Sequence, residues 1–103
     1  MKVQELAQRM KSGNPPAVVD VRTGFEFKAG HIPGALHAPT WKIVLRLARL
    51  PRDKEAELVV HCEMGPRAVA ARKLLLYLGF KNVDLLEGHM SGWRRAGLPI
   101  EKP

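Results

Sequence analysis

The chain has 103 residues, of which 46% are hydrophobic and 26% charged, values typical of a globular domain. No apolar run approaches the ~20 residues that a membrane-spanning helix needs, and the first residues lack the apolar core of a signal peptide. We therefore expect one cytoplasmic domain over residues 1–103. The single cysteine excludes an internal disulfide and a two-cysteine redox mechanism. The formal net charge of +7 favours anionic partners without identifying them.

Apolar spacing predicts the secondary structure along the chain. Residues 4–12 are expected to form the first helix, with a very short strand at Lys2-Val3 before it. Apolar runs predict buried strands at residues 17–21 and 58–60, and two shorter apolar patterns predict strands at residues 36–39 and 82–86. Helical patterns fall between and after them, at residues 25–29, 41–50, 68–78 and 91–96. Strands that alternate with helices predict an α/β fold with an open parallel sheet and helices on both faces.

The predicted helix at residues 41–50 has two different faces, and Thr40 is its expected N-cap. One face is apolar and is expected to be buried, and comprises Trp41, Val44, Leu45 and Ala48. The opposite face is basic without any acid, and comprises Lys42, Arg46 and Arg49. The preferred interpretation of the basic face is simple solvation, and the alternative is a docking face for an acidic protein or RNA.

Cys62 occupies a short loop between a predicted buried strand and the Ala-rich and Leu-rich helix at residues 68–78, which is expected to be largely buried. In open α/β sheets such a loop lies at the carboxyl end of a strand, where ligands bind. Backbone N–H groups and the positive end of a helix dipole converge there. They stabilise a thiolate, as does Arg67, so Cys62 is the candidate nucleophile.

Other polar residues favour structural interpretations. Asp20 and Arg22 are two residues apart in a predicted strand, so their side chains share one face, and an ion pair is the preferred interpretation. The four histidines have no spacing typical of a metal site. His61 precedes Cys62 in the strand, so we expect it to point to the opposite side as a satisfied core histidine.

Several motifs in this order resemble the rhodanese (sulfurtransferase) domain. They are Asp20-Val21-Arg22, Glu26-Phe27, Gly30-His31-Ile32-Pro33-Gly34-Ala35, Cys62-x-x-Gly65-x-Arg67, Gly79-Phe80 and Gly88…Trp93. The resemblance covers nearly the whole chain. It implies an open five-stranded parallel sheet with flanking helices, and an active-site loop that begins at Cys62 and ends at Arg67. It also implies that Cys62 takes up a sulfane sulfur and carries it as a persulfide.

The resemblance gives the surrounding residues expected roles. Backbone N–H groups would form a crown for the persulfide, contributed by Glu63, Met64, Gly65, Arg67 and Ala68. Pro66 has no N–H to contribute, which costs little at the first position of a helix. Arg67 would hold an anionic donor or brace the loop. Asp20 and Arg22 would support the loop from behind.

Two positions depart from the family pattern. Glu63 places a negative charge beside the nucleophile, which disfavours thiosulfate, and Gly88-His89 replaces a frequent Gly-Gly, so His89 is expected at the mouth of the pocket. A protein persulfide or small persulfide is therefore expected to be the better donor. Release of the sulfur needs an outside acceptor, because the chain has no second cysteine.

The sequence thus predicts a sulfurtransferase that moves a sulfane sulfur from thiosulfate or a persulfide to a thiol or cyanide, without cofactor or metal. Expected partners are a small anionic sulfur donor and a thiol acceptor, including a protein persulfide or a thioredoxin-like protein. Nucleic acid and membranes are not expected partners. The alternatives are a non-catalytic sulfur carrier or docking module and, less favoured, a cysteine-dependent phosphatase or arsenate reductase. Rhodanese-like domains also resemble Cdc25-type phosphatases, whose loop is one residue longer. By that resemblance, the six-residue loop from Cys62 to Arg67 implies sulfur rather than phosphate chemistry.

Overall fold

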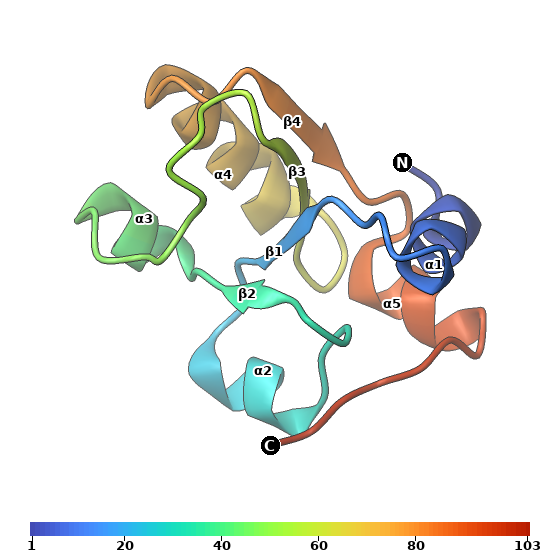
Figure 1. Ribbon diagram of the computed structural model, residues 1–103. Helices are drawn as coiled ribbons and strands as arrows, with labels where there is room; N and C mark the ends of the chain where they lie inside the picture. The colour runs from blue at the N-terminus through green and yellow to red at the C-terminus, as the bar shows by residue number, and fades with distance from the viewer.

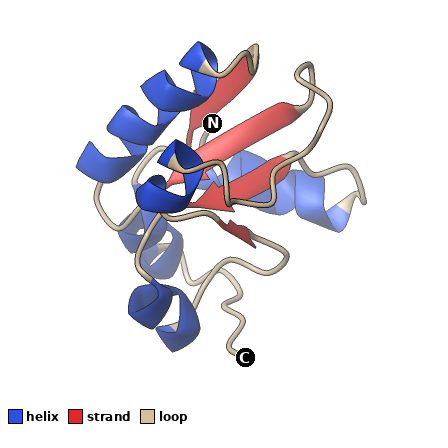
Figure 2. Ribbon diagram, turned by 90° about the vertical axis from the view of Figure 1, so that its left-hand side faces the viewer, coloured by secondary structure: helices blue, strands red, loops and turns tan.

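The computed structural model describes residues 1–103 and has a parallel sheet of four strands with helices on both faces (Figures 1 and 2). Along the chain the elements are α1 (Val3–Lys11), β1 (Ala17–Asp20), α2 (Gly24–Ala29), β2 (Leu36–His37), α3 (Thr40–Val44), β3 (Glu57–His61), α4 (Pro66–Tyr77), β4 (Asn82–Leu85) and α5 (His89–Arg95). The strand order is β2-β1-β3-β4, which makes β1 and β3 the central strands. None of the helices has the length and apolar character required to cross a membrane.

Each face of the sheet has its own hydrophobic core. Successive strand residues point to opposite faces, so Val60 packs with Ala71 and Leu75 of α4, whereas Val59 packs with Leu6 of α1 and Trp93 of α5. All six of these side chains are fully buried. Because β1 and β3 are covered on both sides, the loops after them leave the sheet from a rigid centre.

The predicted fifth strand at Lys2-Val3 is wrong. The helix α1 begins at Val3, which leaves only two residues ahead of it. Met1 nevertheless lies beside the end of β4, where its amino group donates to the Leu85 carbonyl and its own carbonyl accepts from the Glu87 N–H, each at 2.8 Å. One residue therefore takes the edge position that a fifth strand would hold, and the sheet has four strands.

The predicted helix at residues 41–50 is also wrong in its length and in its buried face. The helix α3 ends at Val44, and its N-cap is Pro39 rather than Thr40. Arg46 takes a left-handed conformation with φ of 60°, and the Leu47 N–H donates to the Lys42 carbonyl at 2.7 Å, which closes the helix. Ile43 is the buried residue of α3. Three of the four residues expected to be buried are more than half exposed: Trp41, Val44 and Leu45. Ala48, the fourth, is partly buried and packs against the core.

The helix α4 is less buried than its composition predicts. Ala68, Ala71 and Leu75 form a single buried stripe, while Leu76 and Tyr77 are exposed to 39% and 83%. An apolar composition all round therefore does not mean burial all round, because only one face of α4 meets the sheet. The helix starts at Pro66, two residues before the predicted start at Ala68, and proline thus occupies its first position. Gly79 follows its C-cap Leu78 with a positive φ of 102°.

We expect Arg46→Gly to raise the free energy of unfolding by about 0.5–1 kcal/mol, because glycine adopts the left-handed conformation without the steric cost of a side chain. The matched control is Arg49→Gly, which removes the same charge from an exposed residue without a positive φ. Urea unfolding followed by circular dichroism measures both. Equal effects of the two variants would contradict the assigned strain at Arg46.

Candidate active site

Cys62 lies directly after β3, under the loop that connects this strand to α4. Cys62 is 1% exposed, and its Sγ accepts a hydrogen bond from the Gly65 N–H at 3.0 Å. Gly65 is the N-cap residue of α4, so the sulfur lies at the amino end of a helix of 12 residues. The loop therefore directs a backbone dipole and a helix dipole at the sulfur. Gly65 is the single N–H donor to the thiol sulfur; the wider crown of donors stays a prediction for the persulfide form.

Gly65 is required by the shape of the loop. Its φ is +136°, a value that side chains rarely adopt, and a Cβ atom there would lie 3.2 Å from His89 Nε2. Met64, just before it, is 77% exposed and marks the outer surface of the loop. The glycine thus allows the chain to turn back over Cys62 and bring its N–H to the sulfur.

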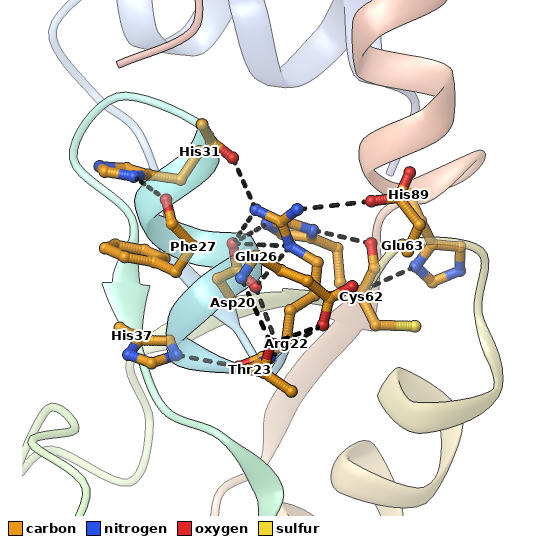
Figure 3. A network of polar contacts seen from close by, with 12 residues as sticks. Asp20, Arg22, Thr23, Glu26, Phe27, His31, His37, Cys62, Glu63 and His89 are labelled. Carbon is orange, nitrogen blue, oxygen red and sulfur yellow. Dashed lines mark hydrogen bonds and ion pairs between the residues drawn. The ribbon is translucent and has the colours of Figure 1, made fainter. Parts of the chain in front are cut away.

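His89 lies against this loop and is 9% exposed, so it braces the loop more than it lines an opening. Its Nδ1 accepts a hydrogen bond from the Cys62 N–H at 3.3 Å (Figure 3). Because Nδ1 is an acceptor, the ring proton of the neutral form resides on Nε2, the atom that faces Gly65. Burial lowers the pKa of His89, which favours this neutral form.

Asp20 and Arg22 form a buried ion pair behind the loop, at 0% and 1% side-chain exposure. Arg22 Nε donates to both carboxylate oxygens of Asp20, and Arg22 Nη2 donates to Asp20 Oδ2 at 2.9 Å and to the Gly30 carbonyl at 2.8 Å. The remaining nitrogen, Nη1, reaches Glu63 Oε1 at 3.4 Å. One arginine therefore ties the end of β1, the loop at Gly30 and the Cys62 loop together (Figure 3).

The negative charge of Glu63 is balanced by arginines on two sides. In addition to Arg22, Arg94 of α5 forms two hydrogen bonds with its carboxylate. These bonds from Arg94 are the main reason that the pKa of Glu63 is lowered. Glu63 is thus ionised, and its charge is neutralised by Arg22 and Arg94. Arg94 was not identified from the sequence, because it lies 31 residues away in the chain.

Arg67 is occupied by Glu26 in a bidentate ion pair, with N–O distances of 2.7 and 3.0 Å. The hydrogen bond from Arg67 is the main cause that lowers the pKa of Glu26 to about 2. A capping box with Thr23 at the start of α2 fixes the position of Glu26. The Thr23-x-x-Glu26 spacing is typical of a capping box, so the sequence could have predicted Glu26 at the start of this helix. Arg67 therefore links the Cys62 loop to the start of α2 through Glu26.

The histidines at the edge of the site are structural. The ring of Phe27 stacks between His31 and His37, with centroid separations of 3.7 and 4.5 Å. His37 Nε2 bonds the Arg22 carbonyl at 2.9 Å, so this stack holds the arginine's backbone. Figure 3 shows the stack beside the polar network.

His61 is fully buried and only half satisfied, which corrects the expectation of a fully bonded core histidine. Its Nδ1 donates to the Cys62 carbonyl at 3.1 Å, whereas its Nε2 has no hydrogen-bond partner and lies 3.7 Å from Asp20 Oδ2. Desolvation lowers the pKa of His61. A neutral His61 therefore lies beneath Cys62 and contacts its backbone, not its sulfur.

A parallel α/β sheet with a cysteine loop before a helix defines an α/β protein with a candidate thiol active site. Residues 2–96 match the family model of the rhodanese-like domain. A sulfurtransferase of Allochromatium vinosum is 35% identical over 97% of this chain and 92% of its own length. A human single-domain sulfurtransferase structure shares 30% identity at a TM-score of 0.79, covering 92% of this chain and 94% of the other. The chain belongs to the rhodanese-like domain family.

Relatives of the family include larger proteins of other kinds. A tRNA uridine(34) hydroxylase of Hamiltonella defensa is 37% identical over the whole of this chain, which spans only 30% of that protein. Family membership therefore defines the fold, and the reaction of this chain depends on its own residues.

Proposed function

We propose that this chain is a sulfurtransferase in which Cys62 accepts a sulfane sulfur and passes it to a thiol or to cyanide. The observation that carries the proposal is the position of the Cys62 sulfur, 3.0 Å from the Gly65 N–H at the amino end of α4. Backbone dipoles stabilise negative charge without binding a particular anion. A persulfide places its terminal charge one S–S bond, about 2.05 Å, beyond the thiol sulfur and towards the loop surface.

The reaction has two exchange steps that balance without an added oxidant. In the first step the Cys62 thiolate attacks the outer sulfur of the donor, an S–S bond forms on Cys62, and the donor leaves as sulfite or a thiolate. In the second step an acceptor thiolate or cyanide attacks the outer sulfur and expels the Cys62 thiolate. The site returns to its first state after each cycle.

The charges around the loop support a persulfide as a better donor than thiosulfate. Arg67 is paired with Glu26, while Arg22 and Arg94 are shared with Glu63, so each of these arginines already has a carboxylate partner. A dianion would have to displace one of those carboxylates. The same balance of charge argues against phosphate monoesters, and thus against the phosphatase alternative.

The test is steady-state sulfur transfer with two donors, thiosulfate and glutathione persulfide, and with cyanide or a small thiol as acceptor. We expect turnover with both donors and a larger kcat/KM for glutathione persulfide. Loading of the protein without turnover would favour the carrier alternative. Neither loading nor turnover with either donor would contradict the proposal.

We expect Glu63→Gln to lower the KM for thiosulfate by roughly tenfold, because it removes a negative charge beside the loop and frees Arg94 while keeping the shape of the side chain. The matched control is Glu57→Gln, which removes a carboxylate paired with Arg9 at the opposite end of β3. Initial rates over a range of thiosulfate concentrations measure the effect. An unchanged KM in Glu63→Gln would contradict the charge argument.

A further inference from the structure

An unusual surface lies beside the cysteine loop, on α3 and the turn after it. Four of its large apolar side chains are 57–61% exposed: Trp41, Val44, Leu45 and Leu47. Several large apolar side chains left exposed on one short helix and its turn are typical of an interaction site. We call these four residues, with Lys42, Arg46 and Arg49, the α3 face.

The α3 face is also strongly basic. Residues 40–52 contain four basic residues and no acid. None of these four residues makes an ion pair: Lys42, Arg46, Arg49 and Arg52. By contrast, every arginine around the cysteine loop has a carboxylate partner. Unpaired positive charge beside exposed apolar groups fits a partner that is acidic and apolar.

The backbone holds these side chains outward. Arg46 is one of only two non-glycine residues with a positive φ, and its turn separates the exposed Leu45 from the exposed Leu47. A left-handed arginine costs free energy relative to glycine. Strain that keeps two leucines in solvent is expected where the exposed side chains serve a purpose.

The α3 face is continuous with the active site. Trp41 and Arg67 line one cavity of about 390 Å³ together with Thr23 and Gly24. Phe25, the next residue, is 86% exposed, and Met64 on the cysteine loop is 77% exposed. A partner bound to the α3 face would thus also contact the surface between α3 and the Cys62 loop.

We propose that the α3 face docks an acidic protein whose own thiol accepts the sulfur from Cys62. This inference rests on the proposed sulfur transfer and adds the acceptor class. On docking, the partner thiolate attacks the outer sulfur of the persulfide, a new S–S bond forms on the partner, and the Cys62 thiolate leaves. RNA fits the face less well, because Val44, Leu45 and Leu47 cannot stack on bases as aromatic side chains do.

The experiment uses the persulfide-loaded protein and two short synthetic peptides as probes. Each peptide has one cysteine and the same leucines, but one carries glutamates and the other carries lysines at the same positions. We expect the acidic peptide to take up sulfur roughly tenfold faster at low ionic strength, and the difference to shrink as salt is added. Equal rates for the two peptides with the wild-type protein would overturn the proposal.

Charge-reversal variants locate the effect. The variant Lys42→Glu/Arg46→Glu/Arg49→Glu should lose the preference for the acidic peptide. The control variant Lys2→Glu/Lys11→Glu/Lys73→Glu changes the net charge equally at exposed lysines without ion pairs, and should keep it. Equal loss in both variants would assign the preference to net charge and overturn the proposal. Thermal unfolding checks that both variants are folded.

Two further measurements distinguish the docking of an acidic protein from the proposed sulfur transfer and from RNA binding. Transfer to 2-mercaptoethanol should be the same in the wild type and both variants, and its absence in the wild type would refute the proposed function itself rather than the docking face. A single-stranded RNA oligonucleotide should not bind the wild type saturably. RNA binding that the triple variant of the α3 face loses, without any peptide preference, would assign the face to RNA and overturn the proposal.

Discussion

Sulfur transfer should fall by roughly a thousandfold or more in Cys62→Ser, because the reaction requires a thiolate and a serine hydroxyl stays protonated at neutral pH. The chain has no other cysteine that could take over the role. The side chain is 1% exposed and nearly equal in size to serine, so the sheet and the loop should be retained. Transfer from glutathione persulfide to cyanide, measured in both proteins, gives the ratio.

Two controls make the loss interpretable. The thermal unfolding midpoint of Cys62→Ser should stay close to that of the wild type, which shows that the loop and both cores are present. Incubation with the donor should leave the mass of the variant unchanged. A variant that still transfers sulfur near the wild-type rate would remove Cys62 from the mechanism.

Arg22→Met should lower the free energy of unfolding by about 3–5 kcal/mol, because it leaves the Asp20 carboxylate buried without its partner. Asp20 is 0% exposed, and Arg22 supplies it with hydrogen bonds from Nε and Nη2. The same change removes the donors to the Gly30 carbonyl and to Glu63. The free energy of unfolding from urea titration measures the loss.

The matched control is Arg9→Met, which breaks the ion pair with Glu57 on the surface. The N–O distance there is 2.8 Å, comparable to that of the buried pair, but the Glu57 side chain is 45% exposed. An exposed pair contributes about 0–1 kcal/mol, so this control should be nearly neutral. Similar losses in the two variants would contradict the claim that burial makes the Asp20–Arg22 pair essential.

The sequence was most informative where a motif is local. The strand before Cys62 follows from composition and is confirmed, and the helix after the loop is confirmed with a start two residues earlier than predicted, at Pro66. The Asp20–Arg22 ion pair was predictable as well, because side chains two apart on a strand share a face. These features depend only on neighbouring residues, so the order of residues is enough to specify them.

The rest of the site could not be predicted because it joins distant segments. Arg67 pairs with Glu26, 41 residues away, and Arg94 pairs with Glu63, 31 residues away. No spacing rule records which of several arginines meets which carboxylate. The α3 face was misjudged for a related reason: apolar periodicity predicts which side of a helix can be buried, but not whether another element covers it.

The most direct test of the account is the mass of the intact wild-type protein after incubation with glutathione persulfide, followed by peptide mapping and a thiol chase. We expect a gain of one sulfur atom, located on the peptide that contains Cys62, and its loss when the thiol is added. Such a result would establish the persulfide as the carried species. An unchanged mass, or a gain that maps to a peptide without Cys62, would contradict the central claim that this loop carries sulfur.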